Sequence, residues 1–359
     1  MKRKIMAVTL TAAMLAGLAA VPVWADDTGS DEGKVLNIYC WNEEFKSRLT
    51  DHYPGYEEVD GTHGKIGDVD VVWNITPSDD NAYQNNLDET LLKQADASAD
   101  DKIDLFLVEA DYALKYVNTD YTMPVADLGI TEDEVADQYQ YTKDVMTDAD
   151  GNLKGLSWQG CPGTMIYRRD IAKEVFGTDD PDEVGKIFKD YPTILETAQT
   201  LKDAGYRIFS SDAEMNVFSG DSAWVVDGTL NVDQSRIDYM DLCVDLYQND
   251  LTAYASQWST PWYQAMAGEV PILTADIQSN ADDSVNVWDA DQFAEATKGL
   301  DTTTVFAFGL PSWGVLTMRD NVGETSGLWG VCSGPAAGFD GGTYIGISSQ
   351  SERKDTACL

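Results

Sequence analysis

Apolar runs of strand length alternate with helix-like stripes in the first third of the chain, and this alternation constrains the fold most. The runs are residues 35–41, 69–75 and 103–108. Between the second and third runs, Tyr83, Leu87 and Leu91 recur every four residues and predict a helix with one buried face. Strand and helix in turn predict the α/β class, with a mostly parallel sheet flanked by helices.

The length of the chain predicts more than one such unit. A chain of 359 residues exceeds what one hydrophobic core usually serves, so we expect two domains. Residues 233–248 predict a long helix with one apolar face. That face carries Ile237, Met240, Val244 and Tyr247.

A short acidic motif predicts a turn in the middle of the chain. Asp150-Gly151 is typical of a hairpin turn between short strands. Asp148, two residues earlier, gives the motif some likeness to a calcium loop, but its glycine comes too early for an EF-hand. We therefore predict a turn without a metal ion.

The amino terminus has the three parts of a secretory signal peptide. Lys2, Arg3 and Lys4 form a basic region, residues 5–20 are apolar, and a cleavage pattern ends at Ala25. We predict a signal peptide over residues 1–25 and a polar leader over residues 26–33. No later segment is apolar and long enough to span a bilayer, so the sequence predicts a soluble, exported protein.

The charge balance argues against nucleic acid as a partner. The chain has 24 Lys+Arg against 62 Asp+Glu, a formal net charge of −38. Such a surface repels phosphate backbones and anionic lipid. The acidic residues are spread along the chain, which favours a soluble globular protein rather than a disordered tail.

Cysteine and histidine usage offers no metal or redox motif. The five cysteines are an odd number at wide spacings without a C-x-x-C pair, so no disulfide framework is predicted, although a single bridge stays open. The only histidines are His52 and His63, both near predicted turns. We expect no metal site and no cofactor.

Sequence motifs of catalysis are absent as well. The chain has no H-E-x-x-H, G-x-S-x-G, P-loop or G-x-G-x-x-G pattern. A glycoside hydrolase needs only two carboxylates at a set separation, and 62 acidic residues always provide such a pair. A secreted carbohydrate-active hydrolase therefore stays open as an alternative.

Tryptophans at strand ends point to a carbohydrate ligand. Trp41 and Trp158 each follow an apolar strand and precede polar residues, at the edge where open α/β sheets bind ligands. An indole can stack on the apolar face of a pyranose, while carboxylates and amides bind its hydroxyl groups. No cluster of Arg or Lys occurs at these strand ends, which argues against an anionic ligand.

Five segments resemble one family. KVLNIYCWN (34–42), DDKIDLFLVEADYALKYVNT (100–119), GNLKGLSWQGCPGTMIYRRDIAKEVFG (151–177), VFAFGLPSWG (305–314) and GFDGGTYIGIS (338–348) are similar to segments of the carbohydrate-type extracellular solute-binding proteins of bacterial ABC transporters, the maltose-binding-protein-like family. Each motif is modest, but their order and spacing together are specific. They span nearly the whole chain after the signal peptide.

The resemblance implies a two-lobed periplasmic-binding-protein-like fold, each lobe a mostly parallel sheet with helices, joined by hinge strands. Lobe 1 would comprise residues 34–147 and 340–359, and lobe 2 residues 148–339. The implied protein is a monomer, not an enzyme, and delivers a sugar or oligosaccharide to the permease subunits of an ABC importer. Ligand would favour the closed form of the two lobes.

The resemblance and the strand-end argument together give a candidate ligand site. Its residues would come from strand ends of lobe 1, from the hinge and from lobe 2, where Trp313 would stack on the sugar. Trp224 is a weaker candidate. The candidates are Trp41, Asn42, Glu43, Glu109, Asp111, Trp158, Gln159, Trp224, Trp313, Gly342, Thr343 and Tyr344.

Two departures from the family pattern affect the expectations. Leu18 stands where a lipobox cysteine would follow Leu15-Ala16-Gly17, so the protein would be periplasmic or extracellular without that anchor. The family continues beyond Asp355 with helices that complete both lobes, which implies a C-terminally truncated chain. The acidic candidates Glu43, Glu109 and Asp111 keep a peptide or polyamine ligand open as an alternative.

Overall fold

The structure, a computed structural model, describes residues 34–220, 222–273 and 286–357. The predicted signal peptide and polar leader lie outside the described residues, as does Cys358. Within the described part of the chain, no helix combines the length and the apolar character that a membrane crossing requires.

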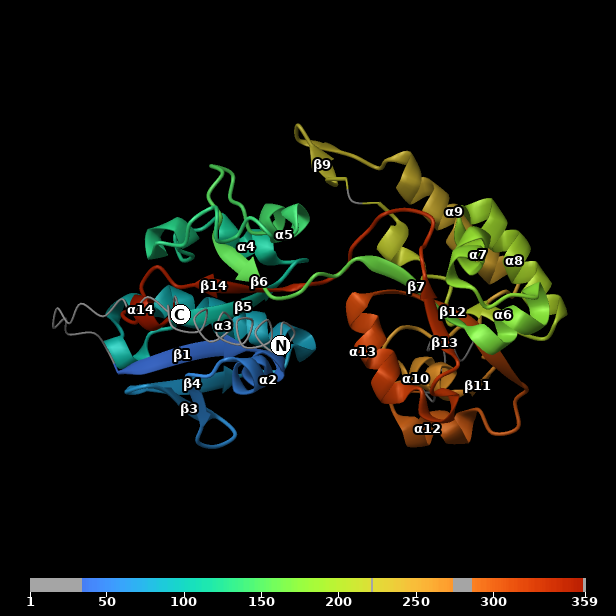
Figure 1. Cartoon of the computed structure of the whole chain (residues 1–359), viewed down its shortest axis with the longest axis horizontal. Helices are drawn as coiled ribbons and strands as arrows, with labels where there is room; N and C mark the ends of the chain where they lie inside the picture. Colours follow the sequence, from blue (N-terminus) through green and yellow to red (C-terminus); the bar gives the residue numbers. More distant parts are fainter. Residues whose placement is uncertain (1–33, 221, 274–285, 358–359) are drawn as a thin grey trace, which may run out of the picture.

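The first lobe is built on a seven-stranded sheet with the order β2-β3-β4-β1-β5-β14-β6 (Figure 1). Its strands are β1 (Val35–Cys40), β2 (Tyr56–Glu58), β3 (His63–Ile66), β4 (Val69–Ile75), β5 (Leu105–Glu109), β6 (Gly155–Ser157) and β14 (Thr343–Ile347). β1 is parallel to β4 and β5, whereas β14 is antiparallel to β5 and β6. The three apolar runs of the sequence are confirmed as β1, β4 and β5.

Helices of the first lobe pack on this sheet through apolar faces. They are α2 (Glu44–His52), α3 (Ala82–Lys93), α4 (Ala113–Val117), α5 (Gln140–Val145) and α14 (Lys354–Ala357). The predicted stripe of α3, Tyr83, Leu87 and Leu91, is buried. The Tyr83 hydroxyl also donates to the Leu107 carbonyl of β5 at 2.6 Å, which fixes α3 on the sheet. The predicted buried face is therefore confirmed.

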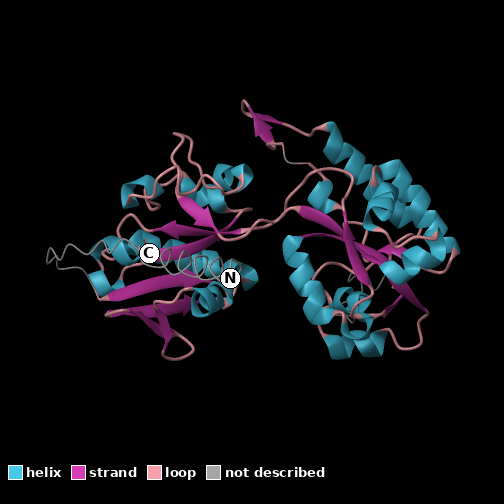
Figure 2. Ribbon diagram, viewed as in Figure 1, coloured by secondary structure: helices cyan, strands magenta, loops and turns pink. Residues whose placement is uncertain are grey.

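The second lobe is built on a five-stranded sheet with the order β11-β12-β7-β13 and with β8 beside β12. Its strands are β7 (Gly163–Arg168), β8 (Arg207–Phe209), β11 (Glu269–Pro271), β12 (Thr302–Pro311) and β13 (Trp329–Cys332). Helices surround the sheet (Figure 2). They are α6 (Arg169–Phe176), α7 (Pro181–Gly185), α8 (Tyr191–Asp203), α9 (Gln234–Gln248), α10 (Thr260–Ala267), α12 (Ala290–Ala296) and α13 (Ser312–Asn321).

The two-lobed α/β fold is thus confirmed, but the sheets are mixed rather than mostly parallel. Among the described strands of the second sheet, β8–β12 is the one parallel pair. The reason is the path of the chain, because β7 leads away from the hinge and its neighbours β12 and β13 lead back.

Two extended segments cross side by side between the lobes (Figure 1). The Gly163 amide donates to the Gly338 carbonyl at 2.8 Å, and the Asp340 amide donates to the Cys161 carbonyl at 3.2 Å. β6, which the sequence places in the second lobe, pairs with β14 in the first sheet. The first crossing therefore begins after β6, and the lobe limits as a whole stay a prediction.

The apolar face predicted for the helix at 233–248 does not face the core. In α9 the buried apolar residues are Leu242 and Leu246. The predicted face is exposed: Ile237 37%, Met240 51%, Val244 49% and Tyr247 43%. α9 has two apolar stripes, and periodicity alone does not tell which one packs on the lobe. The prediction of the helix with this apolar face is confirmed, and the structure shows that the face is exposed.

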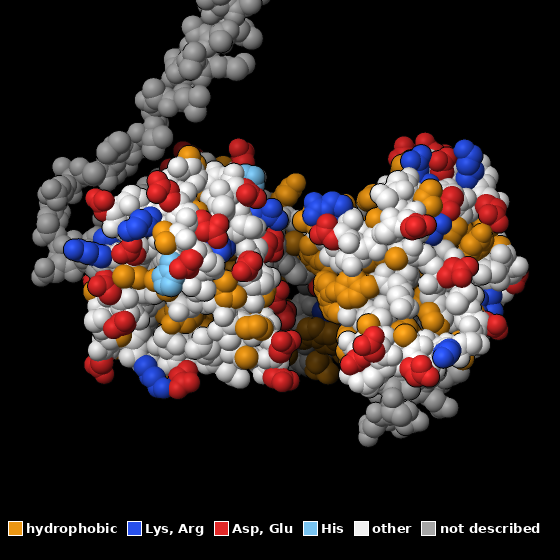
Figure 3. Space-filling view, turned by 90° about the horizontal axis from the view of Figure 1, so that it is seen from below, with side chains coloured by type: hydrophobic (Ala, Val, Ile, Leu, Met, Phe, Trp, Pro, Cys, Tyr) orange, Lys and Arg blue, Asp and Glu red, His pale blue; other side chains and the backbone are white. Residues whose placement is uncertain are grey.

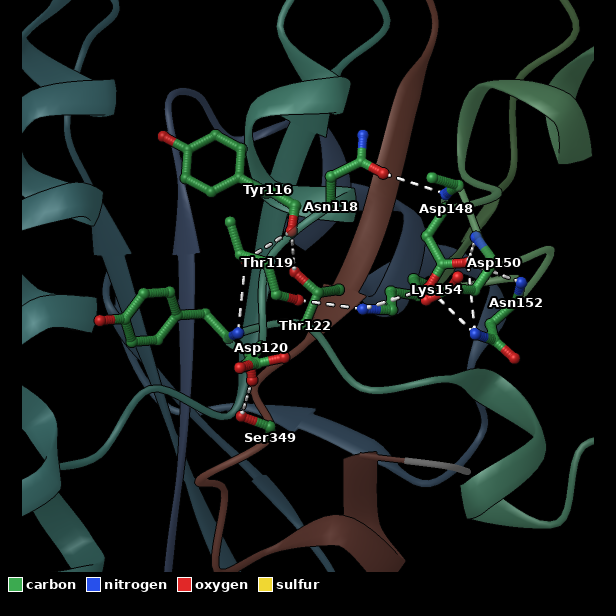
Figure 4. A network of polar contacts seen from close by, with 12 residues as sticks. Tyr116, Asn118, Thr119, Asp120, Thr122, Asp148, Asp150, Asn152, Lys154 and Ser349 are labelled. Atoms are coloured by element: carbon green, nitrogen blue, oxygen red, sulfur yellow. Dashed lines mark hydrogen bonds and ion pairs between the residues drawn. The ribbon is translucent and has the colours of Figure 1, made fainter.

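The turn at Asp148 is confirmed, and the side chain of Lys154 points toward the Asp148 carboxylate (Figure 4). One Asp148 oxygen accepts from the amides of Asp150 and Asn152 at 3.0 and 2.8 Å. The Lys154 ammonium lies 3.4 Å from the other oxygen and donates to the Thr119 carbonyl at 2.9 Å. The described residues contain no cluster of three metal-ligating side chains. This network ties the turn before β6 to the body of the first lobe.

The cysteines of the described residues are free thiols. Cys40, Cys161 and Cys332 are buried and Cys243 is half-buried. Burial raises the pKa of the Cys40 and Cys332 thiols to about 12, so both remain protonated and inert at neutral pH. The absence of a disulfide framework among these four residues agrees with their wide spacing in the sequence.

Candidate ligand-binding cleft

The predicted residues of the first lobe gather along one edge of its sheet because of strand direction. β1 and β5 are parallel, and both end at this edge, before Trp41 and after Glu109. β14 begins at the same edge, where Thr343 lies opposite Glu109. β6 runs antiparallel to β14 and also ends there, before Trp158. The edge thus brings together four segments that are far apart in the sequence.

Gln159 locks this edge together. Its amide oxygen accepts from the Thr343 backbone N–H at 2.8 Å, and its amide nitrogen donates to the Glu44 carboxylate at 3.0 Å. The side chain of Gln159 therefore joins β14 to the first turn of α2. Gln159 thus positions the edge, and its amide keeps one N–H and one lone pair that can bind a ligand in the cleft.

A cleft of about 800 Å³ separates this edge from the second lobe. Figure 3 shows the hollow between the two lobes. Its walls are α2 in the first lobe, the first crossing segment, and α13 in the second lobe. The lining residues are Glu44, Arg48, His52, Trp158, Gln159, Gly160, Cys161, Ser312, Trp313, Leu316, Thr317, Arg319 and Asp320.

Two indoles line the cleft, one at the end of the first sheet and one in the second lobe. Trp158 stacks on Phe45 of α2, with ring centroids 5.0 Å apart and planes 20° from parallel. Trp313 stacks on Trp258 at 5.1 Å and 20°. Its indole N–H donates to the Asp340 carbonyl at 3.2 Å. Each indole is held by a second aromatic ring, so its orientation is fixed before any ligand arrives.

The crossing segments hold the first turn of α13. The Ser312 amide donates to the Pro162 carbonyl at 3.1 Å, and the Ser312 hydroxyl donates to the Gly160 carbonyl at 2.5 Å. Trp313 follows directly. Because α13 is tied to the crossing segments, its position is coupled to the hinge.

Two arginines line the cleft, and both lie on helices rather than at the strand ends considered in the sequence. Arg48 comes from α2 and Arg319 from α13, so the tertiary structure brings together residues far apart in the sequence. A guanidinium nitrogen of Arg48 lies 3.3 Å from the Glu44 carboxylate, and Arg319 lies 2.8 Å from that of Asp320. Each charge is balanced locally, so the lining carries no excess positive charge from these pairs.

Carboxyl groups lie at the hinge side of both lobes. Burial, together with repulsion from Asp111 and Asp340, raises the pKa of Glu109 to about 7. Burial and Asp111 also raise the pKa of Asp340. In the second lobe, burial raises the pKa of Glu214 to about 8. Glu214 and Asp340 line a small cavity of about 110 Å³. This part of the molecule therefore combines several carboxyl groups, of which Glu109, Asp340 and Glu214 are largely withdrawn from solvent.

Other predicted residues lie at the edge without lining the cleft. Trp41 is half-buried and packs edge-on against Tyr83 at 5.4 Å, as a core residue does. Asn42 accepts the Glu44 amide at 2.9 Å and, like Glu43, is exposed. Asp111 is exposed beside Glu109.

The residues predicted on the returning segment are buried, and Trp224 lies elsewhere. Gly342 has a φ of 116°, which favours glycine, and Tyr344 is fully buried. Thr343 is 5% exposed and bound to Gln159. Trp224 precedes the hairpin of β9 (Val225–Val226) and β10 (Thr229–Leu230), is 58% exposed and packs on Arg236.

Sequence reasoning missed the residues of the helix faces. Glu44, Arg48 and His52 lie at four-residue spacing on α2 and face the cleft together. Their spacing was visible in the sequence, but nothing there indicated which side of α2 is open. Trp258 was missed because no strand precedes it.

Comparisons with known proteins agree with this architecture. Residues 66–358 match the family model of the bacterial extracellular solute-binding proteins. No curated protein matches the chain. Three solved structures illustrate the likeness, and at identities below a fifth it establishes the fold.

One of them is an extracellular solute-binding protein of family 1, with a TM-score of 0.63, 19% identity, and coverage of 91% of this chain and 73% of that chain. Another is the galacto-N-biose-/lacto-N-biose I-binding protein of the ABC transporter from Bifidobacterium longum, in complex with lacto-N-biose. Its TM-score is 0.59 at 14% identity, and the match covers 91% of this chain and 74% of that chain. A third is the sugar-binding protein MalE from Xanthomonas citri, with a TM-score of 0.57, 16% identity, and coverage of 90% of this chain and 73% of that chain. With a family model that matches most of its length and a two-lobed fold around a central cleft, this chain belongs to the family of bacterial extracellular solute-binding proteins.

Proposed function

We propose that this chain is the substrate-binding component of an ABC importer and that it captures a neutral sugar or oligosaccharide in the interlobe cleft. The observation that carries the proposal is the pair of preset indoles, Trp158 and Trp313, in one cleft with carboxylate, amide and guanidinium groups. Indole faces complement the C–H face of a pyranose, and the charged groups give strong hydrogen bonds to its hydroxyl groups.

The balanced charges of the lining support a neutral ligand. Arg48 is paired with Glu44 and Arg319 with Asp320, so a sugar hydroxyl can bind between donor and acceptor without an uncompensated charge. The solved relatives from Bifidobacterium longum and Xanthomonas citri are described as sugar-binding proteins or bind a disaccharide, which agrees with this ligand class.

Capture follows from the hinge. A ligand that touches both Trp158 and Trp313 binds the closed form more tightly than the open form and shifts the population toward closure. The permease subunits of the importer would recognise that closed form. No covalent step is involved, so the chain is not an enzyme in this proposal. It works as an exported monomer, periplasmic or extracellular, without nucleic acid or cofactor.

An amine-bearing ligand is the second candidate, and the acidic groups Glu109, Asp111 and Asp340 favour it. A positive charge near these carboxyl groups would lower the raised pKa of Glu109. A polyamine or a basic peptide would use this part of the molecule rather than the indoles.

Thermal unfolding of the protein with a panel of ligands tests the proposal. The panel contains neutral mono- and oligosaccharides, uronic acids and polyamines. A ligand at a hundred times its Kd stabilises the folded state by about 2.7 kcal/mol. We expect a higher Tm with a neutral saccharide. A higher Tm with polyamines alone would show that the ligand is an amine and not a saccharide. Release of cleaved products from a bound glycan would favour a hydrolase.

A further inference from the structure

Two tyrosines of the first lobe hold the crossing segments from one side. The hydroxyl of Tyr141, in α5, accepts the Cys161 backbone N–H of the first segment at 2.6 Å. The Tyr141 ring stacks on Phe339 of the second segment, with centroids 4.6 Å apart and planes 29° from parallel. Tyr139 stacks on Tyr141 in turn, at 6.0 Å and 19°. One side chain of the first lobe thus contacts both segments.

A glycine of the first segment allows this close approach. A side chain at Gly160 would place its Cβ 3.0 Å from the Tyr139 ring, closer than carbon atoms usually pack. The Tyr141 hydroxyl lies 3.6 Å from the same point. The two tyrosines therefore lie directly against the backbone that joins the lobes (Figure 1).

The second lobe holds the same two segments a few residues away. Val217 and Phe218 belong to the buried core of that lobe. A Cβ at Gly163 would lie 2.8 Å from the Val217 side chain and 2.9 Å from the Phe218 ring. A Cβ at Gly338 would clash with the Val217 carbonyl group. At these two glycines both segments are therefore fixed on the second lobe.

Very little backbone lies between the two sets of contacts. In the first segment, Pro162 alone separates Cys161 from Gly163, and in the second segment Phe339 follows Gly338 directly. Rotation of one lobe against the other is absorbed by a few backbone angles in such a connection. The proline ring fixes one of these angles. The bend is thus short and restricted.

Hydrogen bonds from α13 span this short stretch. The Ser312 hydroxyl donates to the Gly160 carbonyl, and the Trp313 indole N–H donates to the Asp340 carbonyl. Gly160 and Asp340 lie on the side of the stretch that Tyr141 holds. Rotation of the lobes therefore changes both bonds as long as the segments stay on the first lobe. Without Tyr141 the segments can follow α13 instead, and the bend moves back toward β6.

We propose that Tyr141 is a positioning residue of the hinge, which holds both crossing segments on the first lobe and confines bending to residues 161–163 and 338–340. Tyr141 does not line the cleft, so it acts without touching a ligand. A bend confined to few residues leaves fewer arrangements of the lobes, so closure on a ligand costs less conformational entropy. The inference goes beyond the proposed function and can be tested without a ligand.

Interlobe distances in the ligand-free protein test the inference. Electron double resonance would use spin labels on ketone amino acids that replace the exposed Lys93 and Lys298, one in each lobe, which avoids the native thiols. We expect Tyr141→Ala to widen the distance distribution about twofold, because both contacts with the segments are lost. Tyr141→Phe keeps the ring stack and should widen it less. Tyr247→Ala removes a half-exposed tyrosine that packs edge-on against Tyr254 in the second lobe, and this matched control should leave the distribution unchanged.

Hydrogen exchange tests the same contact in the unmutated protein, in case Tyr141→Ala does not fold. The Cys161 amide is bonded to the Tyr141 hydroxyl, so its exchange should be at least about a hundredfold slower than in an unstructured peptide, and faster in Tyr141→Phe. An unprotected Cys161 amide, or equal distance distributions in the wild type and Tyr141→Ala, would overturn this inference while the proposed function stands.

Ligand affinity links the hinge to capture. For a saccharide that the wild type binds, Tyr141→Ala should bind roughly threefold more weakly, because its lobes must be ordered from more arrangements. An unchanged affinity would overturn the role of Tyr141 in capture. A wild type that binds no saccharide would overturn the proposed function, and the interlobe distances would still decide whether Tyr141 confines the bend.

Discussion

The two lobes form the cleft with different kinds of structure. In the first lobe, the cleft-facing edge is made of strand ends, and Gln159 ties β14 and α2 together through hydrogen bonds. In the second lobe, the wall is the first half of α13, where Trp313 stacks on Trp258, a residue that does not itself line the cleft. The first wall is organised by backbone pairing and the second by aromatic packing. The comparison shows that one wall is fixed mainly by hydrogen bonds and the other mainly by ring stacking.

The largest expected effect comes from removing the aromatic surface of the second wall. Trp313→Ala should weaken binding of the saccharide ligand about a hundredfold, or about 2.7 kcal/mol, because Trp313 is the indole that the second lobe contributes to the cleft lining. Trp158→Ala should weaken binding about tenfold, because the Phe45 ring on which Trp158 stacks remains and keeps an aromatic surface at that wall. Isothermal calorimetry measures both. Equal losses for the two variants would remove the difference between the walls.

An intermediate effect is expected in the pH dependence of stability, where Glu109 in the first lobe and Glu214 in the second are among the carboxyl groups with a raised pKa. For Glu109 the pKa is about 7 in the folded protein against an ordinary value of 4.5. The folded protein holds a proton that the unfolded chain releases, so its stabilising contribution is complete below about pH 4.5 and is lost as the pH rises through about 7. Glu109→Gln should therefore be more stable than the wild type at pH 8, by about 1–3 kcal/mol, and similar near pH 4.

Glu214→Gln provides the matched variant in the second lobe. Burial raises the pKa of the Glu214 carboxyl to about 8. The gain in stability of Glu214→Gln over the wild type should therefore keep growing as the pH rises to about 8, above the range in which Glu109→Gln reaches its full gain. Urea unfolding between pH 4 and 9 measures both variants. Asp340 repels the Glu109 carboxylate, so in an Asp340→Asn background the gain in stability from Glu109→Gln should be smaller. The gain from Glu214→Gln should be unchanged in the same background. If Asp340→Asn changed both gains in stability by a similar amount, two explanations would be contradicted. These are that Asp340 repels the Glu109 carboxylate and that burial raises the pKa of Glu214 without Asp340.

The smallest effect on stability is expected for a substitution on an exposed helix face, because the two lobes differ in whether an apolar helix face is buried. In the first lobe the apolar stripe of α3 is buried, but in the second the stripe at Met240 and Val244 of α9 is exposed. Met240→Lys should change the free energy of unfolding by no more than about 0.5 kcal/mol, as surface substitutions usually do. Leu246→Ala, on the buried side of the same helix, should cost about 2–5 kcal/mol. Chemical unfolding compares them, and a large loss in Met240→Lys would show that this face is covered in solution.

Prediction from the sequence succeeded where the residues of an apolar run or stripe are the same residues that pack in the core. β1, β4 and β5 are short apolar runs, and α3 has one apolar stripe, so each left little choice of structure. At α9 periodicity predicted the helix but not its buried side, because the helix has two apolar stripes. The arginines of the cleft were also missed, since Arg48 and Arg319 come together only when the two lobes are assembled.

The candidate site was anticipated in the same uneven way. Trp158, Gln159 and Trp313 line the cleft, and Glu109 and Thr343 lie at the predicted strand ends. Tyr344 is sealed in the core and Trp224 belongs to a hairpin. An aromatic residue at a strand end packs into a core or faces a ligand according to which neighbours surround it, and its own position in the sequence does not record them.

By itself, the sequence determined the α/β elements of the first lobe and the family resemblance, because hydrophobic periodicity and local motifs are properties of neighbouring residues. Only the tertiary structure decided which faces border the cleft, how the charges there are balanced, and that Trp258 stands beside Trp313. Those features depend on contacts between segments far apart in the chain. Their geometry is set by sheet pairing and hinge position rather than by local composition.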